Sequence, residues 1–347
     1  MRKPWPVLVI SIGVIFSGVW LYALLAPVIS QQAGMVYYLK QGTSTSALIS
    51  DLSQRGVIRF PFLFTVYAHL KPRTHLKAGE YYFPKGSSAV SIWRQVTQGI
   101  GFFQRSFTII PGWSFKQLRQ ALLRAEGLKQ ELVQNDDKQL MKRLGYPQGY
   151  PEGEFFPETY YYTRGLSDFT ILKRAVDLMQ KKLADAWQSR AAKLPYKNAY
   201  QALIAASLIE KETHLDDERP MIAGVMINRL EKNMLLQIDP TVIYGMGERY
   251  QGIINKKDLL QDTPYNTYIH TGLPPTPIAI PSMASIHAAL HPAQHPYYYF
   301  VALGKQGHQF SKTLIAHQAA VAAVTHRQQT YFNEALVRRY AMSILSK

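Results

Sequence analysis

The stretch "ALIAASLIEKETHLDDER", Ala202 to Arg219, joins an apolar helix to a cluster of acids. The eight residues before Glu210 carry no charge, and Glu210 and Glu212 follow directly. A helix that is apolar on every side is typical of a buried core element. The sequence therefore places two carboxyl groups where a core helix ends.

Both acids continue helix faces that are apolar one turn earlier: Glu212 lies in line with Leu208 and Ile209, and Glu210 with Ala206. Apolar surroundings and the negative end of the helix both disfavour an ionised carboxylate and raise its pKa. A carboxyl group that is protonated near neutral pH is what a general acid requires. Solvated charges at a helix end are the alternative for both acids: Glu210, next to Lys211, is more typical of that alternative, whereas Glu212 is followed by Thr213, whose hydroxyl could fix a carboxylate.

Composition limits the class of protein. The 347 residues are 47% hydrophobic, which indicates a globular chain with a substantial core. The net charge of +16 suits nucleic acid, anionic lipid or an acidic polymer. No nucleic-acid-binding signature accompanies that charge, so nucleic acid is not expected as a partner. Because cysteine is absent, thiol catalysis and thiolate metal sites are excluded.

The N-terminus predicts a membrane anchor. Arg2 and Lys3 precede an uncharged run from Pro4 to Leu39, longer than the ~20 apolar residues that span a bilayer. Positive residues before the span place the N-terminus in the cytoplasm and the rest outside. A cleaved signal peptide is the alternative, but its apolar core would be only ~7–15 residues long. We expect a single-pass protein of the cytoplasmic (inner) membrane, with residues 1–35 as cytoplasmic stub and anchor.

Residues 36–125 repeat a short pattern three times. An aromatic or β-branched run leads through Gly-x-Ser into an apolar helical period in "YYLKQGTSTSALISDL", "YYFPKGSSAVSIWRQV" and "TIIPGWSFKQLRQAL". Glycine permits the turn, and serine caps the helix that follows. Each unit therefore predicts a strand, a turn and a helix, and such modules resemble the LysM glycan-binding fold.

Residues 126–347 predict a second domain in which helices and short strands mix without regular alternation. Helical periods cover 171–183, 200–213, 219–232, 283–290 and 314–324, while "YYYFVAL" indicates a strand. The fold class is therefore α+β. His287, His291 and His295 are spaced four apart, but Pro292 and Pro296 interrupt any helix there. No H-E-x-x-H or G-x-S-x-G is present, and we expect neither a metal nor a cofactor.

Nine further segments carry a resemblance to a known family. In order and spacing they resemble the YceG-like (MltG) family of endolytic murein transglycosylases, along nearly the whole chain. The segments are "LKAGEYYF", "EGEFFPETY", "SLIEKET", "INRL", "LQIDPTVIYGMG", "TPYNTY", "TGLPPTPIAIPS", "HPAQHPYYYFV" and "GHQFSKT".

The resemblance implies the reaction and its acid. The catalytic glutamate of that family is the second of E-K-E-T, here Glu212. It implies cleavage of the β-1,4 bond between N-acetylmuramic acid and N-acetylglucosamine, with closure of a 1,6-anhydro ring. A hydrolase would ordinarily use two carboxylates, with Asp239 as the second, whereas a single acid suits the lytic route.

The same motif positions imply supporting residues. Polar and aromatic side chains there could bind the sugars or equally hold loops together: Thr213, Asn228, Gln237, Asp239, Thr241, Tyr244, Asn266 and Tyr268. The expected partners are peptidoglycan glycan strands, the lipid bilayer and peptidoglycan synthases. A membrane-anchored protein that only binds glycan, or a division scaffold, is the alternative, although a pure binder has no need for an acid at Glu212.

Overall fold

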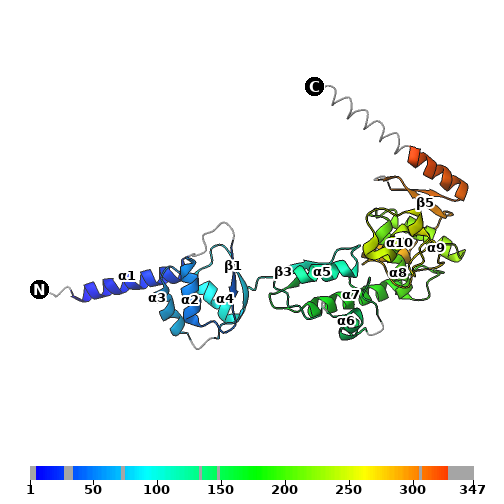
Figure 1. Cartoon of the computed structure of the whole chain (residues 1–347). Coiled ribbons are helices and arrows are strands. Elements are labelled where there is room, and N and C mark those ends of the chain that lie inside the picture. The colour runs from blue at the N-terminus through cyan, green and yellow to red at the C-terminus, as the bar shows by residue number, and fades with distance from the viewer. Residues whose placement is uncertain are drawn as a thin grey trace, which may run out of the picture. The chain divides into compact units, whose positions relative to one another are not determined.

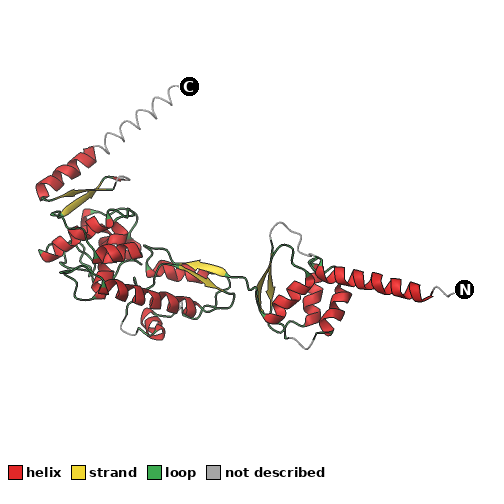
Figure 2. Ribbon diagram, turned by 180° about the vertical axis from the view of Figure 1, so that it is seen from behind, coloured by secondary structure: helices red, strands yellow, loops and turns green. Residues whose placement is uncertain are grey.

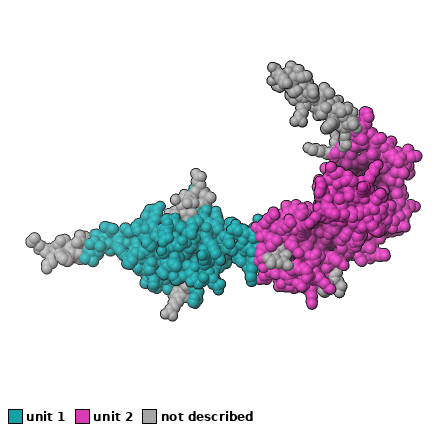
Figure 3. Space-filling model, in the orientation of Figure 1, with its two compact units in different colours: residues 1–107, 125–129, 161–167 teal, residues 108–124, 130–160, 168–347 magenta. Residues whose placement is uncertain are grey.

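The computed structural model describes residues 5–26, 34–71, 75–132, 135–146, 149–304 and 307–326 (Figure 1). These residues form two compact units, coloured separately in Figure 3. Unit 1 comprises residues 1–107, 125–129 and 161–167, and unit 2 comprises residues 108–124, 130–160 and 168–347. Helices dominate both, and the strands pair as β1–β2, β3–β4 and β5–β6 (Figure 2). The α+β class is confirmed, and the predicted boundaries at residues 35 and 125 stay predictions.

Unit 1 is built on an antiparallel strand pair covered by helices. Its elements are α1 (Trp5–Leu25), β1 (Met35–Leu39), α2 (Thr45–Gln54), α3 (Pro61–His69), β2 (Gly79–Phe83) and α4 (Ala89–Gln98). Met35 pairs with Phe83 and Leu39 with Gly79, which fixes the register. Large apolar side chains from both strands and from α2 fill the core, including Leu39, Leu48, Leu52, Tyr81 and Phe83.

The three strand–turn–helix units predicted from the sequence are present. The glycine of each turn has a positive φ, at +79°, +84° and +78° for Gly42, Gly86 and Gly112, a conformation that costs glycine least. The serines cap as expected: Ser44 accepts from the Ala47 amide, and Ser88 from the Ser91 amide. Local sequence chemistry thus determines these units.

The first helix coincides with the predicted anchor. Side chains of α1 are described from Val9 onward, and most of them are apolar and exposed. Across all the helices whose side chains are described, none is both long and apolar enough to cross a membrane. The predicted span stays a prediction.

Unit 2 is largely helical. The chain passes from one unit to the other within β3 (Arg105–Thr108) and again within β4 (Thr159–Tyr162). The other elements of unit 2, before a last helix at 314–326, are α5 (Phe115–Arg124), α6 (Asp137–Leu144), α7 (Asp168–Gln188), α8 (Ala199–Glu212), α9 (Arg219–Glu231), α10 (Asp239–Met246), η1 (Gly247–Arg249), α11 (Lys256–Leu259), α12 (Met283–Leu290), β5 (Tyr299–Ala302) and β6 (His308–Ser311). The predicted helices in this domain are all present.

Helix α8 is the centre of unit 2. Every residue from Ala202 to Glu210 is buried, because α7, α9, α10 and α12 pack around the helix. Its alanines at 202, 205 and 206 are small enough for close helix packing, chiefly against α12. The surrounding helices explain why α8 is apolar on every side, and its last turn is where the chain can present a polar group.

Candidate active site

The two acids at the end of α8 have opposite environments. Glu210 is buried, and its Oε2 accepts hydrogen bonds from the Ser282 amide at 3.0 Å, from Ser282 Oγ at 2.5 Å and from Ser285 Oγ at 2.6 Å. Arg219 lies 4.0 Å from the other oxygen. The expectation that Glu210 is a solvated charge is therefore wrong: it binds the N-terminus of α12, where a negative charge is favoured.

Glu212 is the last residue of α8 and is only partly exposed. Among the described residues, none donates a hydrogen bond to its carboxyl group. Burial and, as the smaller cause, the negative charge of Asp239 together raise the pKa of Glu212 to about 8. The group is thus a protonated carboxyl at neutral pH with its oxygens free for a ligand, as a general acid requires.

Asp239 and Tyr268 are brought to the same place as Glu212. Asp239 begins α10, and its Oδ1 accepts a hydrogen bond from the Tyr268 hydroxyl. Burial, this hydrogen bond and the charges of Asp239 and Glu212 raise the pKa of Tyr268. The structure therefore assembles an acid, a second carboxylate and a phenol from three separate segments.

The turn before α10 sets this arrangement. Gln237 has a φ of +54°, a left-handed conformation that is uncommon for a residue with a side chain. Its backbone N–H donates to the Thr267 carbonyl, and its side-chain Oε1 accepts from Arg229 Nη1 at 3.3 Å. Gln237 thereby fixes the direction in which α10 begins, and this places Asp239 near the end of α8.

Three other predicted residues hold loops together. Asn228 Nδ2 donates to the carbonyls of His295 and Tyr297, and Asn266 Nδ2 to those of Leu259 and Gln261. Thr241 is buried and bonds to the Ile238 carbonyl and to Thr267 Oγ1. These contacts give the three residues a structural role, and a role of these residues toward substrate stays a prediction.

Thr213 connects the site to β6. It caps α8, and its hydroxyl donates to Glu218 Oε2 at 3.0 Å. The same oxygen lies 2.8 Å from His308 Nδ1. Burial alone would raise the pKa of Glu218, but the hydrogen bonds from His308 and Thr213 outweigh it and lower the pKa. The residue after Glu212 is thus fixed by a hydrogen bond to Glu218, which in turn contacts His308, and the sequence did not indicate these contacts.

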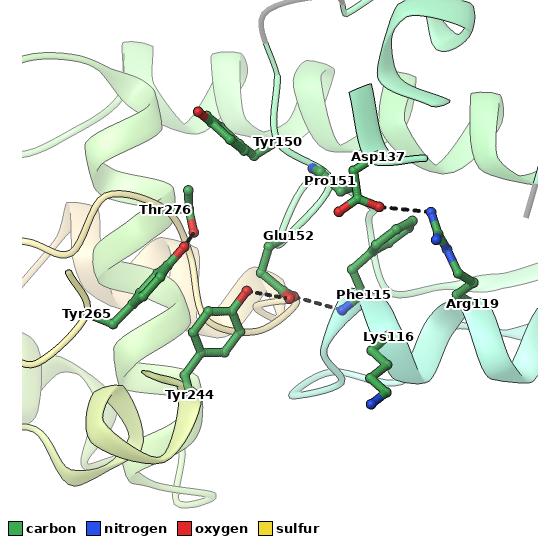
Figure 4. Close-up of a pocket in the computed structure, with 10 residues that line it drawn as sticks. All are labelled: Phe115, Lys116, Arg119, Asp137, Tyr150, Pro151, Glu152, Tyr244, Tyr265 and Thr276. Atoms are coloured by element: carbon green, nitrogen blue, oxygen red, sulfur yellow. Dashed lines mark hydrogen bonds and ion pairs between the residues drawn. The ribbon is translucent and has the colours of Figure 1, made fainter. Parts of the chain in front are cut away.

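Glu152 is the site residue that sequence reasoning missed. It is buried; its Oε1 accepts from the Phe115 amide at 2.9 Å and its Oε2 from the Tyr244 hydroxyl at 3.0 Å (Figure 4). Burial raises its pKa to about 7. Tyr244, predicted to bind substrate, therefore lies against Glu152 and lines a cavity of which Glu212 is not a part. The only local signal was "EGE" in a loop rich in Gly, Pro and aromatic residues.

The three histidines considered as metal ligands do not come together at one place. The rings of His287 and His291 stack with centroids 4.4 Å apart, whereas His295 Nε2 lies 2.8 Å from the Met221 carbonyl. No group of three or more His, Asp or Glu suited to a metal ion occurs in the described part of the chain.

The fold and the site together define a helical α+β domain that presents one unpaired, protonated carboxyl group at the end of its central helix. A family model described as the YceG-like family matches residues 37–323. The chain belongs to this family, and the resemblance found in the sequence is confirmed.

Two curated proteins that are similar to this chain carry the same name. The endolytic murein transglycosylase of Bacillus subtilis (strain 168) is 32% identical over 325 residues, which is 88% of this chain and 90% of that protein. The endolytic murein transglycosylase of Streptococcus pneumoniae serotype 2 (strain D39 / NCTC 7466) is 27% identical over 76% of this chain and 53% of its own length. A crystal structure of a YceG-like protein from Listeria monocytogenes has a TM-score of 0.54 and 29% identity, covering 84% of this chain and 100% of that one.

Proposed function

We propose that this chain is an endolytic murein transglycosylase, a lyase that cleaves peptidoglycan strands at the bond from N-acetylmuramic acid to N-acetylglucosamine. The observation that carries the proposal is Glu212, a carboxyl group with a pKa of about 8 and no hydrogen-bond donor among the described residues, in a chain of this family. Relatives with the same name span most of its length.

Glu212 acts first as an acid and then as a base. Its proton passes to the glycosidic oxygen as the bond to C1 breaks, and positive charge develops on the muramyl ring. The carboxylate then takes the proton of the C6 hydroxyl of the same sugar as O6 bonds to C1. The two proton transfers cancel, no water is consumed, and the product is a 1,6-anhydro end.

Asp239 has a supporting role in this mechanism. Its carboxylate is held by Tyr268 and is close enough to raise the pKa of Glu212. A fixed negative charge there stabilises the positive charge that develops on the sugar ring. Since the nucleophile is a hydroxyl of the substrate, no second catalytic carboxylate is required.

We further propose that the remaining regions hold the enzyme at the membrane and on its substrate. Residues 1–35 anchor it in the cytoplasmic membrane with the N-terminus inside, supported by Arg2, Lys3 and the exposed apolar side chains of α1. Residues 36–125 form a LysM-like region that binds glycan, supported by its repeated strand–turn–helix units. An anchored enzyme that cuts within nascent strands ends their elongation beside the synthases that make them.

The test is the chemistry of the new chain ends. Purified protein is incubated with uncrosslinked glycan strands, and the products are analysed by mass spectrometry. We expect 1,6-anhydro ends on internal fragments. Reducing ends would indicate a hydrolase with Asp239 as second carboxylate, and uncut strands would leave the glycan-binding alternative.

A further inference from the structure

The cavity beside Glu152 has no part in the mechanism above. It has a volume of about 360 Å³ and opens between α5, the loop Tyr150–Glu152 and α10 (Figure 4). This volume lies at the lower end of the ~300–1,000 Å³ typical of ligand pockets. All of its walls belong to unit 2.

Aromatic rings form much of the lining. Tyr244 and Tyr265 meet edge to face with ring centroids 4.7 Å apart, and the Tyr265 hydroxyl is 2.9 Å from Thr276 Oγ1. These contacts fix the ring positions. Tyr150 lies at the margin with 63% of its surface exposed, which is high for so large an apolar ring. Fixed rings beside an exposed one suit a ligand with a flat apolar face.

Both basic side chains of the lining are in ion pairs. Arg119 Nη2 lies 2.9 Å from Asp137 Oδ1, and Lys116 pairs with Glu248 outside the cavity. Glu152 keeps lone pairs beyond the two hydrogen bonds that it accepts. The cavity therefore offers aromatic faces and a hydrogen-bond acceptor to a ligand without net charge.

We propose that this cavity is a saccharide-binding subsite that holds one N-acetylated hexose of the strand. The C–H face of the ring stacks on the tyrosines, and a hydroxyl or the acetamido N–H donates to Glu152. A phosphate is disfavoured by the buried Glu152, and an ammonium group by Lys116 and Arg119.

Helix α10 links the subsite to the reaction centre. Its first residue, Asp239, is beside Glu212, and Tyr244 lines the cavity. Five residues of α-helix span only about 7.5 Å. The proposal therefore rests on the proposed function: the sugar held here belongs to the strand that Glu212 cuts, a short distance from the bond that breaks.

The test separates binding from cleavage. The full chain carrying Glu212→Gln is titrated calorimetrically with an N-acetylglucosamine tetrasaccharide, alone and with Tyr150→Ala added. We expect Tyr150→Ala to weaken binding about 3–10-fold and Glu152→Gln to weaken it as well. In the active chain Tyr150→Ala should raise KM for glycan strands and leave kcat nearly unchanged, since it touches no reacting atom.

Tyr161→Ala is the matched control, because this tyrosine is 60% exposed, does not line the cavity and lies outside residues 36–125. Equal affinity of the Tyr150→Ala and Tyr161→Ala proteins for the tetrasaccharide would overturn the proposal. Displacement of the sugar by a free stem peptide at this site would overturn it too. If the wild type cut no strands while Tyr150→Ala still weakened sugar binding, the proposed reaction would fail and the subsite would stand.

Discussion

Glu210 and Glu212 are two residues apart, but the residues around them give their carboxyl groups different environments. Three hydrogen bonds from Ser282 and Ser285 stabilise Glu210 at the start of α12. Glu212 has burial and a like charge around it, and both favour its protonated form. At this scale the environment, and not the residue type, separates a structural acid from the one that we propose to be catalytic.

The pH dependence of cleavage should report Glu212. Because the acid must be protonated, kcat/KM should fall as pH rises through about 8. Asp239→Asn removes the like charge, so the pKa of Glu212 should drop. The fall of kcat/KM should then occur at a lower pH. It should stay above the ordinary value of 4.5, since burial is the larger cause. A fall of kcat/KM at the same pH in both proteins would contradict the effect of Asp239 on the pKa of Glu212.

Glu210 should matter for stability. Glu210→Ala leaves the buried Ser285 hydroxyl and the Ser282 groups without their acceptor, at a cost of about 2–4 kcal/mol in the free energy of unfolding. The melting temperature should therefore fall by roughly 5–15 °C. Glu212→Gln, which has no such bonds to lose, is the control. Equal melting temperatures for the two variants in calorimetry would show that Glu210 is dispensable for folding.

At the scale of elements, the link from α8 to β6 runs through Thr213, Glu218 and His308. Hydrogen bonds lower the pKa of Glu218, so its contribution to stability is present above the unfolded-state pKa of about 4.5 and is lost as pH falls through the lower folded value. Glu218→Gln should reduce the melting temperature at pH 7 by a few degrees, and the difference should shrink at low pH. It should also reduce kcat, because Thr213 follows Glu212.

Asp217→Asn is the control for Glu218→Gln, because it tests whether loss of any acid in this turn lowers the melting temperature and kcat. Asp217 is the exposed neighbour of Glu218, and its substitution should change neither the melting temperature nor kcat. A Glu218→Gln protein with the melting curve of the wild type at pH 7 would remove the link between α8 and β6.

Sequence predicted those elements whose signals are local. The Gly-x-Ser turns and the serine caps lie within a few residues of what they control, and the structure confirms them. The raised pKa of Glu212 was predictable for the same reason, since its own helix supplies the apolar faces. Glu152 was missed because its partners, Phe115 and Tyr244, are 37 and 92 residues away. Glu210 was misassigned because its donors are 72 and 75 residues away.

At the scale of the whole molecule, the proposed membrane topology and the net charge both favour action on murein. In the proposed topology the chain acts outside the membrane, where a net charge of +16 would favour the carboxylates of murein peptides. The proposed anchor would keep the enzyme near strands as they emerge, where cutting would determine their length. Both features belong to the chain as a whole and to no single site.

The anchor can be tested in cells. We expect the full-length protein to stay with membranes after carbonate washing, and protease added to the outer side to digest everything after the span. The uncharged run that begins at Pro4 is the reason. A shortened soluble form released by signal peptidase would contradict the anchor and leave the site chemistry untouched.

The most direct test of the central claim is strand cleavage by Glu212→Gln, measured as 1,6-anhydro ends by mass spectrometry. The amide keeps the shape of the side chain but can neither give nor take the proton, so the rate should fall by about 10²–10⁴ while the melting curve stays native. Asp239→Asn should retain more activity. An active Glu212→Gln protein beside an inactive Asp239→Asn protein would contradict the assignment of Glu212 as the acid.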